Sequence, residues 1–198
     1  HPTWREVILR GIEEISISRS RLRRDKLRRC NHVLDFAAKY LPNLKGIRMM
    51  GCSRRNVLNF LQQAPSLRAV HFRGHIDEAF ISALNRHDNL HTLILYYCSF
   101  RSMEDLVSLL RPHQRSLVCL EIYHPHIGNV WDSENDSILP FISFIFRPVV
   151  WPDQNRYVEV LSGMKSLKSL TFLNHGLNND SIRLILKKQK QILQLYLQ

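Results

Sequence analysis

The sequence predicts an α/β fold in which short parallel strands alternate with helices along one continuous array. Two observations lead to this prediction. A short apolar pattern with strand-like alternation recurs along the chain of 198 residues, and between its copies the apolar spacing changes to about 3.6 residues, the period of an amphipathic helix. Because a strand followed by a helical crossover leads to a parallel strand, stacked units of this kind give a curved parallel sheet with helices on its convex side.

The recurring pattern is clearest in NLHTLILYYC (89–98), where Leu90, Leu93, Leu95 and Cys98 give L-x-x-L-x-L-x-x-C. Similar cores begin at Ile12, Leu44, Leu67, Leu117, Leu167 and Ile192. Most of the intervals between them fall in the range of roughly 20 to 30 residues that is typical of a leucine-rich repeat solenoid. We therefore expect one domain over 1–198 with about seven or eight repeats, and strands near 14–18, 46–50, 69–73, 92–96, 119–123, 141–145, 169–173 and 194–198.

The stretches between the strand cores predict helices. Apolar stripes with helical spacing occupy 33–41, 57–61, 76–84, 106–110, 158–161 and 182–186. Ser102 followed by Glu104 and Asp105 places acidic residues in a first helical turn, where the helix dipole favours them. Prolines at 42, 65 and 112 predict helix ends.

The repeat pattern, together with a P-x-L restart (PNL at 42–44, PSL at 65–67), resembles the cysteine-containing repeats of F-box/leucine-rich-repeat proteins and is similar to ribonuclease-inhibitor-like solenoids. HGLNNDSIRLIL (175–186) resembles the turn into the helix of such a repeat. The chain departs from the pattern because cysteine ends a repeat only at Cys52 and Cys98, and because no F-box is visible, although PTWREV (2–7) fits the tail that follows one. The resemblance implies the substrate-recognition solenoid of a ubiquitin ligase, linked to a cullin-type ligase adaptor through an F-box upstream of His1.

Strand residues that alternate with the buried leucines line the concave face of a solenoid and are the candidate partner-binding residues. In the middle repeats they include arginine and tyrosine, the residue types that dominate binding hot spots. We expect a protein partner to contact Arg48, Met50, His71, Arg73, Ile94, Tyr96, Glu121 and Tyr123, and Tyr96 and Tyr123 are the first residues to mutate. The alternative is a half-exposed sheet face that binds no partner.

A basic segment, RSRLRRDKLRR (19–29), carries +6 of the formal net charge of +11. Its candidate anion-binding residues are Arg19, Arg21, Arg23, Arg24, Lys26, Arg28 and Arg29. They would bind the phosphates of a nucleic acid or another anionic surface, with salt-dependent affinity, or serve as a nuclear import signal. A solvated insertion is the plainer interpretation, and the lack of alternating aromatic residues counts against a single-strand stacking site.

The long interval over 123–163 has room for a degenerate repeat. Leu139, Ile142 and Phe144 have the spacing of a strand core, which is the basis for the strand expected near 141–145. The polar stretch 129–137 is expected to be an exposed loop. His124 and His126 form an H-x-H pair, but no further ligand stands at a zinc-binding spacing, so we expect surface histidines and no metal.

Motifs for catalysis and cofactor binding do not appear in the sequence. It has no phosphate-binding glycine loop, no G-x-S-x-G and no H-E-x-x-H, so we expect no enzyme activity and no cofactor. Cys98 recurs as a repeat position and is interpreted as a packing residue, since no base accompanies it. The four cysteines are widely spaced, which favours a reduced protein of the cytoplasm or nucleus. No apolar run approaches the roughly 20 residues of a membrane span.

The two ends suggest a fragment. HPTWREVILR has no initiator methionine and no signal segment. QILQLYLQ stops within a predicted strand, with no polar helix to cover it. We therefore expect the natural chain to continue past Gln198, and the chain as given to expose Leu195 and Leu197 beside an unpaired strand edge.

Overall fold

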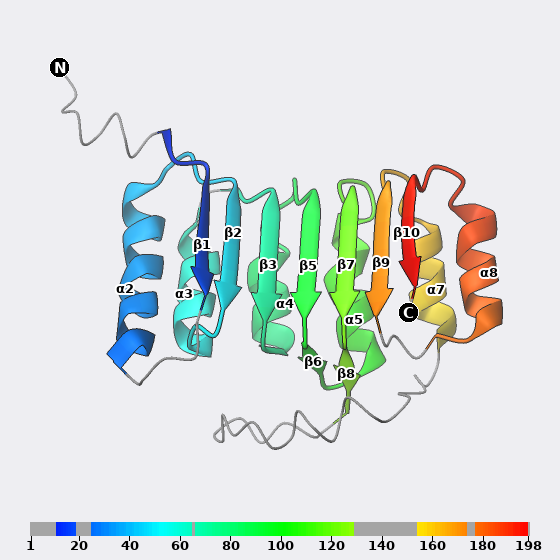
Figure 1. Cartoon of the computed structure of the whole chain (residues 1–198), viewed down its shortest axis with the longest axis horizontal. Helices are drawn as coiled ribbons and strands as arrows, with labels where there is room; N and C mark the ends of the chain where they lie inside the picture. Colours follow the sequence, from blue (N-terminus) through cyan, green and yellow to red (C-terminus); the bar gives the residue numbers. More distant parts are fainter. Residues whose placement is uncertain (1–10, 19–24, 65, 129–153, 174–176, 198) are drawn as a thin grey trace.

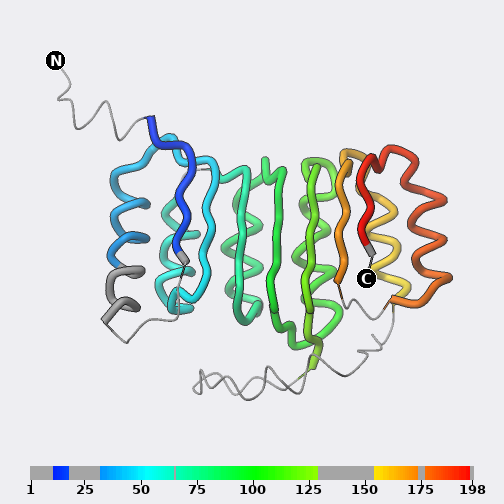
Figure 2. The backbone as a smooth tube through the Cα atoms, viewed as in Figure 1, coloured from blue at the N-terminus to red at the C-terminus, as the bar shows by residue number. Residues whose placement is uncertain are grey.

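A computed structural model describes residues 11–18, 25–64, 66–128, 154–173 and 177–197, and places a seven-stranded parallel sheet at the centre of the molecule (Figure 1). Strands follow one another across this sheet in chain order. They are β1 (Glu14–Ser18), β2 (Gly46–Met50), β3 (Ala69–Arg73), β5 (Thr92–Tyr96), β7 (Cys119–Tyr123), β9 (Ser169–Leu173) and β10 (Gln194–Leu197). The backbone advances in one direction, so its first and last described segments lie at opposite ends of the array (Figure 2).

The helices pack one after another along one side of the sheet, and none of the described helices crosses the front of the sheet in Figure 1. They are α2 (Asp25–Tyr40), α3 (Arg54–Gln63), α4 (Glu78–Leu84), α5 (Met103–Leu110) with a 3₁₀ turn at Arg111–His113, α7 (Gln154–Ser162) and α8 (Asn179–Lys188). The prediction of an α/β fold with a parallel sheet and helices is therefore confirmed.

The register of the sheet explains why these strands form where they do. Position two of each strand pairs with position two of the next, so that Val70 faces Leu93 and Leu93 faces Leu120. Each of these three side chains is fully buried. Because strand side chains alternate between faces, positions two and four pack on the helices while positions one, three and five face the other side. The predicted strand ranges other than 141–145 agree with the structure, apart from residue 198, which lies outside the described residues.

Helix starts follow their capping residues. The Ser102 hydroxyl accepts from the Asp105 backbone N–H, and the Asp105 carboxylate accepts from the Ser102 N–H, which is a complete capping box at the start of α5. Asp77 caps α4 and Asn178 caps α8 with a single hydrogen bond each, in which the side-chain oxygen accepts from a backbone N–H of the first turn. The helix start that Ser102 and its acidic neighbours predict is confirmed.

Three details of the predicted helical stripes are wrong. Leu186, in the stripe predicted over 182–186, is 39% exposed. In α2, Leu34 and Ala37 are buried, whereas Val33, Phe36 and Tyr40 are exposed. The predicted stripe was too wide, because α2 is the first described helix and packs against α3 on one side. Ile76 does not begin a helix but lies fully buried in the short strand β4 (His75–Ile76), two residues before α4 starts.

The strand expected near 141–145 has no place within the central sheet. β7 pairs directly with β9 along its whole length, from Cys119 opposite Ser169 to Tyr123 opposite Leu173. Since a parallel strand has one neighbour on each side and β7 also pairs with β5, the prediction of an intervening repeat strand is wrong. Residues 141–145 themselves lie outside the described residues, as do the exposed loop predicted at 129–137 and the F-box tail at 2–7.

A second, smaller parallel sheet, which the sequence did not predict, extends the ends of the central strands. It consists of β4, β6 (Ser99–Phe100) and β8 (His126–Ile127) in that order. The chain changes direction before each of these strands through a residue with positive φ. At Gly74, with φ 149°, a Cβ atom would lie 3.0 Å from the Phe72 ring, so this position requires glycine.

The last strand leaves apolar side chains at the edge of the sheet. Among the described residues β10 pairs with β9 alone, and Leu193, Leu195 and Tyr196 are 79%, 39% and 57% exposed.

We expect this exposed edge of β10 to drive end-to-end association of the chain. Leu193→Glu combined with Tyr196→Lys should lower the association constant about tenfold, as measured by sedimentation velocity. Asn89→Glu with Gln62→Lys is the control, and a stable monomer of the unchanged chain at high concentration contradicts the expectation.

Candidate interaction surface

The side chains at positions one, three and five of the central strands form what we call the open face, the side of the sheet away from the helices. Position three runs Ser16, Arg48, His71, Ile94, Glu121, Thr171 and Tyr196. Position five includes the pairs Met50–Arg73, Tyr96–Tyr123 and Tyr123–Leu173. The register therefore brings all eight sequence-predicted partner-binding residues onto this one face of β2, β3, β5 and β7.

Two tyrosines on the open face stack on each other. The ring centroids of Tyr96 and Tyr123 are 4.8 Å apart with an interplanar angle of 12°. The Arg48 guanidinium carbon lies 5.7 Å from the centroid of Tyr96, within cation–π range. Because the strand order is β2-β3-β5-β7, the guanidinium approaches Tyr96 from one side and the Tyr123 ring from the other. We call this row of three side chains the face ladder.

The carboxylate of Glu121 holds Tyr123, the member of the face ladder farthest from Arg48 along the strand order. The Tyr123 hydroxyl donates to Glu121 Oε2 at 2.8 Å, and the Cys119 thiol lies 3.6 Å from the other carboxylate oxygen. Burial, followed by the interactions with Glu121, raises the pKa of Tyr123 above its usual range, and burial with the same carboxylate raises the pKa of Tyr96. Both phenols are therefore neutral hydrogen-bonding groups at physiological pH.

The remaining predicted residues differ in how accessible they are. Arg48 and Arg73 are exposed, and Met50 and His71 are half-buried. Burial and then the Arg48 charge lower the pKa of His71, so it is a neutral ring in the middle of the site. Ile94 is only 7% exposed, since its register neighbours His71 and Glu121 flank it. It supports the surface by packing and offers little area to a partner.

A second row of stacked groups lies beside the first and was missed by the sequence analysis. The rings of Tyr97 and His124 are 4.7 Å apart and nearly parallel, at 6°, and the Arg73 guanidinium carbon lies 5.3 Å from the Tyr97 centroid. We call this row the edge ladder, because Tyr97 and His124 directly follow the last residues of β5 and β7. The signal was present in the sequence as the doublets Tyr96–Tyr97 and Tyr123–His124, which occupy the same offset in neighbouring repeats.

The histidines predicted at the surface are partly buried instead. His124 is half-buried in the edge ladder and His126 is half-buried in β8, so the prediction of surface histidines is wrong. Burial lowers the pKa of both rings. Within the part of the chain that the structure describes, no three histidine, cysteine or acidic side chains group closely enough to hold a metal ion.

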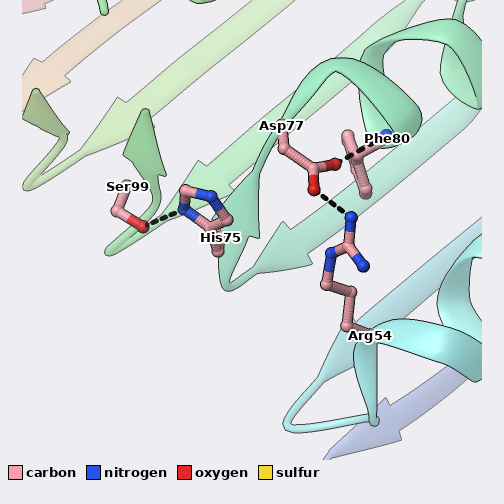
Figure 3. A network of polar contacts seen from close by, with 5 residues as sticks. All are labelled: Arg54, His75, Asp77, Phe80 and Ser99. Atoms are coloured by element: carbon pink, nitrogen blue, oxygen red, sulfur yellow. Dashed lines mark hydrogen bonds and ion pairs between the residues drawn. The ribbon is translucent and has the colours of Figure 1, made fainter. Parts of the chain in front are cut away.

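A set of polar contacts connects neighbouring repeats (Figure 3). His75 Nδ1 and the Ser99 hydroxyl are 2.9 Å apart, which links β4 to β6. Asp77 accepts from the Phe80 backbone N–H and forms an ion pair with Arg54, which links α4 to the preceding repeat. Ser99 is 1% exposed, and Asp77 is engaged by its cap and by Arg54. The geometry is that of repeat-to-repeat packing.

Cys98 has the environment that the packing interpretation requires. It is 1% exposed, and its thiol lies 3.5 Å from the Phe72 carbonyl oxygen, which accepts the weak S–H hydrogen bond. Burial raises the pKa of the Cys98 thiol to about 12. A thiol this hard to ionise and this inaccessible is a poor nucleophile, so the structure agrees with the packing role.

The basic segment 19–29 cannot be placed as a site. Residues 19–24 lie outside the described residues, and the remainder falls in the first turn of α2, whose side chains are not described. The predicted anion site stays a prediction. In the described parts of the chain, no helix combines the length and the apolar character that crossing a membrane requires.

Comparison with known proteins adds little to what the structure shows about this surface. No protein-family model and no curated protein matches this sequence. Among solved structures, the tropomodulin C-terminal domain of Caenorhabditis elegans is similar at a TM-score of 0.38 and 12% identity, over 94% of this chain and 90% of that chain. A likeness at this level carries no conclusion about function.

Proposed function

We propose that the chain is a protein-interaction module, built as a leucine-rich repeat solenoid whose open face is the concave, partner-binding surface. The observation that carries the proposal is the face ladder, in which an arginine and two stacked tyrosines stand side by side on the sheet face that none of the described helices covers. Arginine and tyrosine dominate binding hot spots because they offer large contact areas and directed hydrogen bonds. The face is preorganised by stacking and by the Tyr123–Glu121 hydrogen bond, which lowers the entropy cost of binding.

The tyrosines are the sharpest test of this surface. Tyr96→Ala with Tyr123→Ala should weaken binding of the physiological partner by at least about 2 kcal/mol, or roughly thirtyfold. Affinity capture from cell extract, quantified against the unchanged chain, measures the loss. Thr92→Ala with Gln194→Ala alters position one of the same face, away from the ladder, and should leave capture unchanged. Equal loss in both variants, or no loss in either, contradicts the assignment of the site.

We further propose, on the resemblance of the repeats, that the module recognises substrates for an F-box-type ubiquitin ligase. The cysteine-ended repeat with Leu90, Leu93 and Leu95 supports this. Its experiment is a pull-down of the full-length natural chain, which should recover a cullin-type ligase adaptor. Absence of the adaptor removes the ligase role and leaves the interaction module standing.

Binding of nucleic acid or another anionic surface through residues 19–29 is the alternative function, and the +6 charge of that segment favours it. Each neutralised phosphate releases counterions, so binding should weaken steeply as salt is raised. Replacing the arginines of 19–29 with glutamine should flatten that dependence. A response to salt that is already flat in the unchanged chain excludes this function.

A further inference from the structure

Two residues of the edge ladder, Tyr97 and His124, have a strained backbone. Tyr97 has φ 48° and His124 has φ 49°, in the left-handed region that side chains rarely adopt. The residues that directly follow β2 and β3, Gly51 and Gly74, also have positive φ but are glycines. Glycine would occupy all four positions without strain, yet two of them carry aromatic rings that stack on each other. A strained position that glycine would relieve points to a function for the side chain.

The two ladders share one composition and lie next to each other. Each begins with an arginine and continues into a stacked pair of rings, and Tyr96 and Tyr97 are adjacent in the chain. Stacking on a ring is compatible with bidentate hydrogen bonding to a carboxylate, because guanidinium donors lie in the plane of the group. The arrangement therefore presents two oriented cations, Arg48 against the Tyr96 ring and Arg73 against the Tyr97 ring.

The charges around the ladders favour an acidic partner. The cations are Arg48 and Arg73, both exposed. The carboxylate next to the face ladder, Glu121, is engaged by the Tyr123 hydroxyl, and Glu14 lies at the N-terminal end of β1, the opposite end of the strands from Tyr97 and His124. His71 and His124 add no charge near neutral pH, because burial lowers the pKa of both. Among the described residues, the C-terminal strand ends of the open face thus carry two exposed arginines and one hydrogen-bonded carboxylate.

The stacking geometry separates a peptide from a nucleic acid. A protein that binds single-stranded nucleic acid offers exposed ring faces on which bases stack. Here Tyr96 has Arg48 on one side and Tyr123 on the other, and Tyr97 has Arg73 and His124 in the same relation. The central rings therefore present their edges and the guanidinium groups, which suit carboxylates and small apolar side chains.

We propose that the face ladder and the edge ladder together bind an extended acidic segment of a partner protein, whose carboxylates pair with Arg48 and Arg73. This inference rests on the proposed function and names the partner chemistry of the same surface. The exposed arginines supply charge complementarity and direct the acidic side chains, while Met50 and the tyrosine edges contact the apolar side chains between them. Tyr97 and His124, next to Arg73, thereby extend the site beyond the open face.

The test uses a fluorescein-labelled peptide of about twelve residues that alternates glutamate with phenylalanine and leucine. A matched peptide carries glutamine for glutamate, and a third probe is single-stranded DNA of similar length. Fluorescence anisotropy on the full chain should show the acidic peptide binding at least about tenfold more tightly than the glutamine peptide and the DNA. Arg48→Gln with Arg73→Gln should abolish that preference, whereas Arg86→Gln with Arg115→Gln, which alters the charge equally at exposed positions away from the ladders, should preserve it.

Glycine variants of the strained positions give a second, independent readout. Tyr97→Gly with His124→Gly should weaken the acidic peptide about tenfold while thermal unfolding shows that the chain stays folded, since glycine accepts positive φ. Equal binding of the acidic and glutamine peptides, preference for the DNA, no binding of any probe, or full binding by the Arg48→Gln, Arg73→Gln variant each overturns the acidic-segment proposal. The proposed function fails separately, when Tyr96→Ala with Tyr123→Ala leaves capture of the natural partner unchanged.

Discussion

Replacing Phe172 with alanine is expected to lower the free energy of unfolding by about 3 to 5 kcal/mol. The side chain is fully buried at position four of β9, and its ring meets Tyr157 of α7 edge-on at a centroid distance of 6.0 Å. Truncation loses this contact and leaves a cavity between sheet and helices. Urea denaturation followed by circular dichroism measures the change, with the slope m checked for constancy.

The neighbouring residue provides the control. Thr171 is half-buried and faces the opposite side of the same strand. Thr171→Ala should cost less than about 1 kcal/mol, because it removes only a partly exposed side chain from the open face. Similar losses in the two variants would contradict the alternation of buried and open positions on which the placement of the site depends.

Acidification from pH 7 to pH 4 is expected to remove about 3 kcal/mol of stability through His113 alone. This ring is fully buried. Its Nε2 lies 3.1 Å from Asn85 Oδ1, so Nε2 carries the hydrogen, and Nδ1 has no hydrogen-bond partner among the described residues. Charging the ring would put a proton on Nδ1 in an apolar environment. Burial, followed by the nearby His87, therefore lowers the pKa of His113 to about 4.

The direction of the pH effect follows from this lowered pKa. The unfolded chain takes up the proton near the ordinary histidine pKa of about 6.5, whereas the folded chain resists it until about pH 4. The stabilising contribution is therefore complete above pH 6.5 and is lost as the pH falls from there to 4. His87 adds to the effect in the same direction, because burial also lowers its pKa.

A neutral substitute isolates this effect. His113→Gln should flatten the acid limb of the stability curve, measured by urea denaturation at several pH values, while keeping a donor for Asn85. His91→Gln, at an exposed position, should leave the acid limb as it is. A chain whose loss of stability between pH 7 and pH 4 is unchanged by His113→Gln would show that other groups control it.

The strands could be predicted closely because β2, β3, β5, β7 and β9 all carry the same buried pair. Leu93 and Leu95 in β5 correspond in register to Leu120 and Ile122 in β7, and a shift by one residue would turn such a pair out of the core. The direct pairing of β7 with β9 could not be predicted, because the sequence pattern does not show whether β7 pairs with the strand expected near 141–145 or with β9. The exposure of Val33, Phe36 and Tyr40 in α2 could not be predicted for a similar reason. The apolar pattern does not show that, of the described helices, only α3 packs against α2.

The shared face of the eight predicted residues could be predicted from the sequence, whereas the stacking among them could not. Alternation placed Arg48, Tyr96 and Tyr123 on one face correctly. That Arg48 reaches Tyr96 across β3 depends on side-chain length and direction, which a repeat alignment does not contain. Tyr97 and His124 were missed because the residue after a strand is ordinarily interpreted as a turn. Their positive φ angles become visible only in three dimensions.

Site-specific photo-crosslinking in cells tests the central claim most directly, since it captures whichever protein lies against the chosen position. A benzophenone amino acid replaces Met50 on the open face in one version of the chain, and Asn59 on the exposed side of α3 in another. The account predicts a covalent protein adduct from position 50 that disappears in the Tyr96→Ala, Tyr123→Ala background, and none from position 59. Adducts from position 59 alone, or an adduct from position 50 that survives loss of both tyrosines, would contradict the open face as the binding surface.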